Sequence, residues 1–189
     1  MKNNITKLQF SRLASMLETM NELDEVWSQK IQKARAEAAT AGRSDVADYL
    51  ALRAANDALR QTSIKWLFDS LHEIAAFSNR NGTNITIETE NPHRFAFKNS
   101  TLVGALARLR QGVRCLTVEA GWTRTPADGF MRGGALAIGR VSHFGISKHN
   151  AELYLILEND APAWFADRDG ERSRFDSRHL NEHFQLFLD

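Results

Sequence analysis

The first 80 residues have the apolar spacing of amphipathic helices. From residue 5 to residue 39, apolar side chains recur at alternating intervals of three and four, which is typical of a coiled-coil seam. The two seam positions are occupied by Phe10, Leu13, Leu17, Met20, Trp27, Ile31, Ala34 and Ala38, with Asp24 as the exception. Gly42 favours a helix end and Ser44 favours the N-cap of a second helix. This pattern predicts an antiparallel helical hairpin that ends near residue 80.

The second helix of this hairpin carries an apolar stripe that the sequence places in a core. Its members are Val46, Leu50, Leu59, Trp66, Leu67, Leu71, Ile74 and Phe77. Because two helices alone bury little apolar surface, we expect the hairpin to pack against the rest of the chain or against a second copy of itself. Trp66 is therefore expected to be a buried residue whose loss is costly.

After residue 80 the period of the pattern changes from about 3.6 to 2, which favours strands. Strands are expected over 85–88, 94–98, 113–122, 135–144 and 152–158, with Leu153, Leu155 and Leu157 pointing inward in the last of them. The Asn91-Pro92 pair predicts a turn between the first two strands. Apolar positions between Ser100 and Gly112 predict a short helix. The segment from Asp160 predicts a loop or edge hairpin, in which Trp164 and Phe165 form an apolar plug.

The last predicted element is a helix capped by Asp176 or Ser177, with Leu180, Phe184 and Phe187 on one face. The predicted class is therefore α+β. An N-terminal antiparallel helical hairpin occupies residues 1–80. A mostly antiparallel sheet with one or two packed helices and a glycine-rich loop occupies residues 81–189.

Apolar and polar residues alternate regularly along residues 113–122, but this alternation breaks down within residues 135–144. In the first strand, Leu116, Val118 and Trp122 share a face. In the second strand, strict alternation from Leu136 and Ile138 would bury Arg140, so we expect a bulge at Gly139 that turns Val141 and His143 inward. Either Arg140 or His143 then faces partly buried surface and needs a polar partner, for which Glu119 is the nearest candidate.

Seven of the eleven glycines lie between Gly112 and Gly145, and several fall in the loop that joins these two strands. That loop also contains Pro126 and Asp128-Gly129, so its backbone has an imposed shape. Arg124 and Arg132 lie beside Trp122 and Phe130, a pairing suited to an anionic or flat partner. The candidate ligand-binding residues are Glu119, Trp122, Arg124, Arg132, Arg140 and His143.

Charge is distributed unevenly along a chain whose net charge is +1. Residues 108–149 contain seven basic and two acidic side chains, a net charge of +5, whereas residues 150–189 contain four and nine, a net charge of −5. Such a basic segment is typical of a surface that binds polyanions. The acidic segment can equally pack beside the basic one and neutralise it, and the sequence leaves both interpretations open.

Motifs for catalysis and metal binding are weak. Residues 179–183 match the H-x-x-E-H pattern of inverted zinc peptidases, but the chain ends at Asp189, before any later helix that would supply a third ligand. We therefore interpret the match as chance and expect a solvated histidine face, with no metal. Phosphate-loop and dinucleotide fingerprints are not found, and no cofactor is expected. Glu119 and His143 could form an acid–base pair, although no nucleophile accompanies them.

The single cysteine, Cys115, excludes an internal disulfide. The N-terminus has no unbroken apolar run, and no segment approaches the roughly 20 apolar residues of a membrane helix. These features predict a cytoplasmic protein without a membrane partner.

The sequence thus favours a non-enzymatic binding or regulatory module. We expect it to self-associate through its helices and to contact an anionic partner through the arginine-bearing loop. That partner would be nucleic acid, a nucleotide-like ligand or an acidic protein surface. The alternative is a small enzyme in which Glu119 and His143 act as an acid–base pair and Arg124 or Arg132 holds an anionic substrate.

Overall fold

The computed structural model describes the chain except residues 1–25, 27, 126–127, 130, 132 and 169. The chain divides into two compact units, Met1–Ala58 and Leu59–Asp189. This division falls inside one long helix, α2 (Ser44–Arg80). The boundary expected from the sequence, at residue 80, coincides instead with the end of that helix.

The first unit contains the predicted helical hairpin. Helix α1, helical over residues 28–40, contacts the first half of α2. The turn between them is made by Gly42, whose φ of 72° is in the left-handed region. The backbone N–H of Gly42 donates to Ala39 and that of Arg43 donates to Ala38, the paired bonds of a Schellman motif. The hairpin and its glycine stop are therefore confirmed.

The described part of the predicted seam also has the expected burial. Ile31 and Ala38 are buried and Ala34 between them is half-buried, so the spacing of three and four holds here. The seam residues from Phe10 to Trp27 lie outside the described residues.

The second unit is built on a seven-stranded antiparallel sheet whose strand order follows the sequence. The strands are β1 (Thr86–Phe97), β2 (Ser100–Gln111), β3 (Arg114–Trp122), β4 (Ala137–His143), β5 (Ala151–Glu158), β6 (Ala161–Arg168) and β7 (Glu171–Phe175). Two-residue turns join several neighbours, and Lys98, Gly112, Asn159 and Asp160 in these turns have positive φ. Such turns match the twist of paired strands. The predicted α+β class is confirmed.

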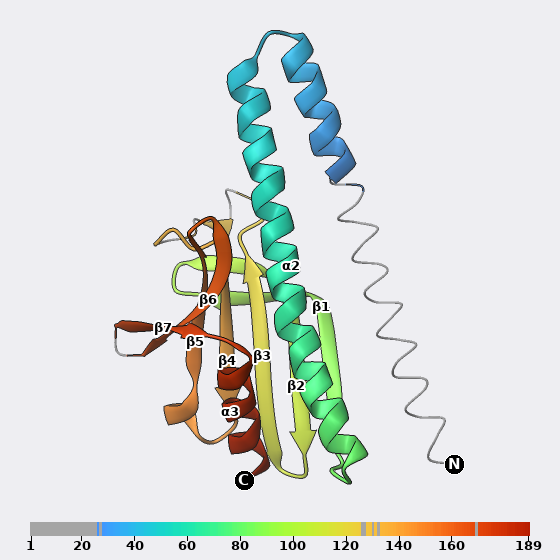
Figure 1. Ribbon diagram of the computed structural model, residues 1–189, viewed down its shortest axis with the longest axis vertical. Helices are drawn as coiled ribbons and strands as arrows, with labels where there is room; N and C mark the ends of the chain where they lie inside the picture. The colour runs from blue at the N-terminus through green and yellow to red at the C-terminus, as the bar shows by residue number, and fades with distance from the viewer. Residues whose placement is uncertain (1–25, 27, 126–127, 130, 132, 169) are drawn as a thin grey trace, which may run out of the picture. The chain divides into compact units, whose positions relative to one another are not determined.

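Both helices of this unit pack on the same face of the sheet (Figure 1). The second half of α2 contributes Ile64, Leu67, Leu71 and Ala75, and α3 (Ser177–Leu188) contributes Leu180, Phe184 and Phe187. As predicted, Asp176 caps α3 through its side chain. We call this face the helix-covered face; the opposite, open face carries no helix within the described residues.

The predicted short helix from residue 100 to residue 112 is wrong, because this segment is strand β2. Its apolar residues fit both the helical period of 3.6 and the strand period of 2. In the strand, Leu102 and Leu106 point to the open face, while Ala107 and Leu109 join the main core. Hydrogen bonding to β1 and β3 on either side decides the outcome. Pairing of this kind is non-local and outweighs the local preference.

The predicted Asn91-Pro92 turn is also wrong. Thr86–Phe97 forms one strand, and the Asn91–Pro92 dipeptide produces a register shift between Glu90 and His93. Proline has no N–H to donate, so it is tolerated in β1, which is an edge strand. The irregularity keeps Glu90 and His93 on the same face of the sheet.

The bulge predicted at Gly139 is not present. Strand β4 pairs with β3 without a shift from His143 to Ile138, so Val141 and His143 face the helices while Ile138 and Arg140 face the open side. Ile138 is nevertheless buried, because the open face has an apolar cluster of its own. That cluster contains Phe95, Phe97, Leu102, Ala135, Ile138 and Tyr154.

Three predicted core residues are exposed. Leu67 and Leu71 of the predicted stripe are fully buried, but Trp66 and Phe77 are 36% and 62% exposed, because the buried stripe of α2 is completed by Ile64 and Ala75. Leu157 is 42% exposed near the end of β5, although Leu153 and Leu155 are buried as predicted. In the predicted plug, Trp164 is buried and Phe165 is half-buried.

Candidate functional site

The glycine-rich loop joins β3 to β4, and the side chain of Asp128 organises its first part. One carboxylate oxygen of Asp128 accepts bonds from the backbone N–H of Arg124 (3.2 Å), the N–H of Thr125 (2.9 Å) and the hydroxyl of Thr125 (3.0 Å). The bonds from Thr125 are the main reason that the pKa of Asp128 is lowered. A negative charge in the loop is thus used to fix the loop backbone.

Arg124 stacks on Trp122, the last residue of β3. Its guanidinium carbon lies 3.5 Å from the centre of the indole ring, within cation–π range. Trp122 is buried on the helix-covered face, so its position is fixed by the core. The guanidinium of Arg60 from α2 lies 5.9 Å from the same ring, and its Nε donates to the carbonyl of Leu136 at 2.8 Å.

Two more arginines reach the loop from the edge strands. Nη1 of Arg94 on β1 lies 3.9 Å from Oδ1 of Asp128. Arg172 on β7 lies beside Gly133, since a Cβ built on Gly133 would be 3.5 Å from Nη2 of Arg172. Arginines from α2, β1, the loop and β7 therefore converge on one loop. Of the sequence-predicted residues here, Trp122 and Arg124 come together, whereas Arg132, Phe130 and Pro126 lie outside the described residues.

Glu119 and Arg140 meet on the open face, directly opposite each other on β3 and β4. Nη1 of Arg140 lies 3.0 Å from one carboxylate oxygen of Glu119, as the sequence suggested. The other carboxylate oxygen lies 3.0 Å from Nε2 of His93. His93 comes from β1 and was not among the residues expected from the sequence. Glu90 lies 3.2 Å from Nδ1 of His93, but that nitrogen makes no hydrogen bond.

Tyr154, which was also not expected from the sequence, lies in the apolar cluster of the open face. Its hydroxyl donates to Glu152 at 3.0 Å and accepts from Nζ of Lys98 at 3.4 Å. Burial and the bond to Glu152 raise the pKa of Tyr154. Arg172 lies 4.8 Å from the centre of the Tyr154 ring. Glu152 is two residues from Tyr154 on β5, but Lys98 and Arg172 come from a turn and from another strand, so no local sequence signal indicates their contacts.

His143 lies on the helix-covered face, so the structure does not bring it together with Glu119. Its Nε2 lies 3.0 Å from Nδ1 of His183 on α3, and both side chains are buried. The expectation of a solvated histidine face on α3 is therefore wrong for His183. His179 is half-buried and pairs with Asp176 at 2.7 Å.

The histidine pair predicts a loss of stability in acid. Burial and then the nearby His149 lower the pKa of His143 from 6.5. A lowered pKa means that the unfolded chain binds the proton more tightly, so stability is retained above about pH 6.5 and lost as the pH falls through the lowered pKa. Two protons between nitrogens 3.0 Å apart would also repel. Urea unfolding at pH 7.5 and at acid pH measures this loss, which His143→Asn should reduce; an unchanged pH dependence would contradict the prediction.

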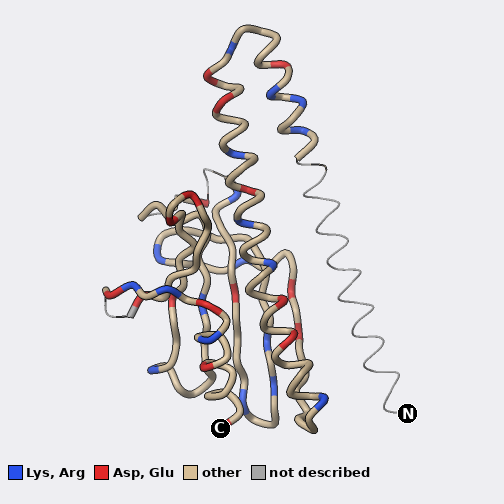
Figure 2. The backbone as a smooth tube through the Cα atoms, in the orientation of Figure 1, with Lys and Arg blue, Asp and Glu red and all other residues tan. Residues whose placement is uncertain are grey.

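Basic and acidic residues, which are concentrated in different segments of the sequence, are intermixed in the folded sheet. Figure 2 shows basic and acidic positions side by side over the sheet instead of in separate halves. Arg110 and Arg140 of the basic segment pair with Glu88 and Glu119, which precede residue 150. Two pairs lie inside the acidic segment itself, Arg172–Asp167 and Arg174–Glu158. Arg114 of the basic segment, by contrast, donates to the last carbonyls of α3 in the acidic segment. The expectation that the acidic segment neutralises the basic one remains a prediction.

Among the described residues, no group of three or more histidine, cysteine or acidic side chains is arranged to hold a metal ion. No helix of the described chain is both long enough and apolar enough to cross a membrane. Comparison of the chain with models of protein families, with curated proteins and with solved structures finds no match in any of the three.

Proposed function

We propose that the protein is a non-enzymatic binding module that contacts an anionic partner through the loop between β3 and β4. The observation that carries this proposal is the convergence of Arg60, Arg94, Arg124 and Arg172 on that loop. Asp128 is the acidic residue of the loop, and it is used to hold the backbone. Asp128 also lies near Arg94, and Asp167 pairs with Arg172, so four arginines and two acidic side chains surround this loop, an excess of basic residues.

The chemistry of Arg124 narrows the type of partner. A guanidinium that is stacked on an indole is already oriented, so little side-chain entropy is lost when its N–H groups bind an anion. Phosphate groups are bound well by such planar donors. The proposed partner is therefore a phosphate-bearing chain such as single-stranded nucleic acid. Self-association through the helical hairpin and a cytoplasmic location remain predictions.

Replacing Arg124 with glutamine should weaken this binding. Glutamine keeps part of the packing on Trp122 but removes the charge. We expect affinity for a single-stranded oligonucleotide to fall by roughly tenfold, and the slope of log K against log salt to become shallower by about 0.7 to 1. Fluorescence anisotropy at several salt concentrations measures both quantities.

The matched control is Arg178→Gln, which removes an exposed arginine from the start of α3. Its affinity and salt slope should equal those of the parent protein. If Arg124→Gln binds as tightly as the parent protein, or if both variants weaken equally, the loop is not the binding site. If the parent protein does not bind the oligonucleotide at low salt, the proposal fails altogether.

A further inference from the structure

Large apolar side chains are exposed at the end of the second unit where β3 begins, opposite to the proposed binding loop. Val113 and Phe144 are 91% and 78% exposed. We call the set the apolar end; its members are Phe77, Val113, Phe144, Ile146 and Leu186. Most of the exposed large apolar residues of this unit belong to the apolar end, so the exposed apolar surface of the unit is concentrated there.

The two most exposed residues lie on turns that are held side by side. The backbone N–H of Phe144 donates to the carbonyl of Cys115 at 2.9 Å, two residues after Val113. Gly112 and Gly145 adopt positive φ beside them and form the turns. Turns of this kind normally carry polar residues, because the side chains point to water. Val113 and Phe144 therefore project outward as tips and do not line a groove.

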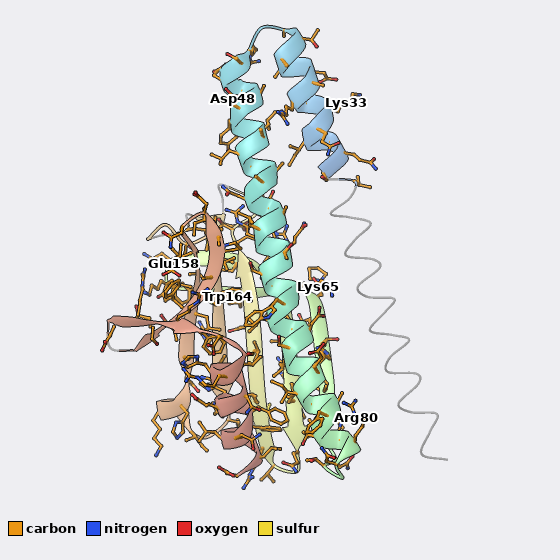
Figure 3. All side chains as sticks on the ribbon, in the orientation of Figure 1. Lys33, Asp48, Lys65, Arg80, Glu158 and Trp164 are labelled. Atoms are coloured by element: carbon orange, nitrogen blue, oxygen red, sulfur yellow. The ribbon has the colours of Figure 1, made fainter. Side chains whose placement is uncertain are left out.

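Basic residues lie close to these tips along the chain and at the end of α2. Arg110 and Arg114 flank the turn that carries Val113, Lys148 follows Phe144 by four residues, and Arg80 is the last residue of α2. Arg80, labelled in Figure 3, ends α2 and lies 5.9 Å from the ring of Phe77. Arg114 donates to the last carbonyls of α3, which fixes it beside the end of that helix. Two acidic residues lie at the same end: Glu88 pairs with Arg110 at 3.4 Å, and the carbonyl of Asp189 accepts from Arg114. The net positive charge of the set therefore comes from Arg80 and Lys148.

We infer that the apolar end docks onto an anionic lipid surface. Five exposed side chains are too few for a stable protein interface, which needs roughly 20 residues on each side. Projecting apolar tips with a basic rim are instead suited to a lipid interface, where the tips enter the acyl boundary and the basic side chains contact acidic headgroups. This contact requires no membrane-spanning segment. It also rests on a different region from the proposed binding loop.

Flotation of the full chain with lipid vesicles tests this inference. The protein should bind vesicles of phosphatidylcholine and phosphatidylserine at low salt, and bind vesicles of phosphatidylcholine alone only weakly. The Val113→Ser/Phe144→Ser double variant should bind the anionic vesicles about tenfold or more weakly, because two apolar side chains no longer enter the lipid. Lys148→Glu should weaken the same binding while leaving the apolar tips in place.

Two control variants separate this surface from others. Leu157→Ser removes an exposed leucine at the opposite end of the sheet and should bind vesicles like the parent protein. Arg178→Gln, which removes an exposed arginine at the start of α3, should do the same. The inference is overturned if the parent protein does not bind anionic vesicles, or if Arg124→Gln abolishes binding while the double variant does not. It is also overturned if sedimentation finds a dimer that Phe144→Ser dissociates, without vesicle binding.

Discussion

Replacing Gly104 with alanine should destabilise the sheet unit by about 3 kcal/mol or more. Gly104 on β2 lies directly opposite Gly121 on β3. A Cβ at residue 104 would lie 1.9 Å from the carbonyl oxygen of Ala120 and 2.5 Å from the Cα of Gly121. Both obstacles are backbone atoms of the neighbouring strand, so no side-chain rotation can relieve the clash. Urea unfolding followed by circular dichroism measures the change.

A graded series of glycine variants separates this clash from the ordinary cost of replacing glycine. Gly121→Ala meets the backbone of Val103 at 2.8 Å and should be the next most costly. Gly112→Ala meets nothing within 4 Å but has a φ of 58°, so it should cost only about 1 kcal/mol. If Gly104→Ala costs no more than Gly112→Ala, the close approach of β2 and β3 is wrong.

Truncating Trp164 should have an effect of similar size, about 3–5 kcal/mol. Trp164 on β6 is 3% exposed, and its Nε1 donates to the backbone carbonyl of Ser63 on α2 at 3.1 Å. Figure 3 labels this side chain, which links β6 to the helix. Trp164→Ala therefore removes a large part of the core as well as a hydrogen bond between two elements. Thermal and urea unfolding measure the loss.

Trp66→Ala is the matched control, because the same side chain is removed from an exposed site. The sequence pattern placed Trp66 in the core, whereas it is 36% exposed, so we expect a clearly smaller cost, about 1–2 kcal/mol. Trp164→Phe should fall between the two, since it keeps most of the apolar volume and loses the bond to Ser63. Equal costs for Trp66→Ala and Trp164→Ala would contradict the observed packing of α2.

The parts of the fold that were predictable from sequence are those fixed by neighbouring residues. The spacing of Ile31, Ala34 and Ala38 and the glycine at residue 42 indicate the hairpin, because helical contacts and helix ends are local. The N-cap of α3 at Asp176 was predictable for the same reason, because capping involves only neighbouring residues. Strand β2 was assigned to a helix because its apolar residues suit both periods, and only pairing with β1 and β3 distinguishes them.

In the candidate site, too, the contact between neighbouring residues was predictable, and the contacts between distant elements were not. Arg124 and Trp122 are two residues apart, so their contact could be anticipated. Arg60, Arg94 and Arg172 reach the loop from distant elements, and nothing in their local sequence indicates it. The expected bulge at Gly139 would have changed which strand residues share a face. In the regular register that is observed, Glu119 and His143 point to opposite sides of the sheet, and the proposed acid–base pair is not formed.

The most direct test of the proposed function is to map the binding surface by nuclear magnetic resonance. A labelled sample would be titrated with a short single-stranded oligonucleotide at low salt, and the shifts of the backbone amides and of the arginine Nε–H groups would be assigned to residues. The proposal predicts that the largest shifts occur in residues 123–136 and in the side chains of Arg60, Arg94 and Arg172. Shifts that are absent, or that cluster around Val113 and Phe144 instead, would contradict it.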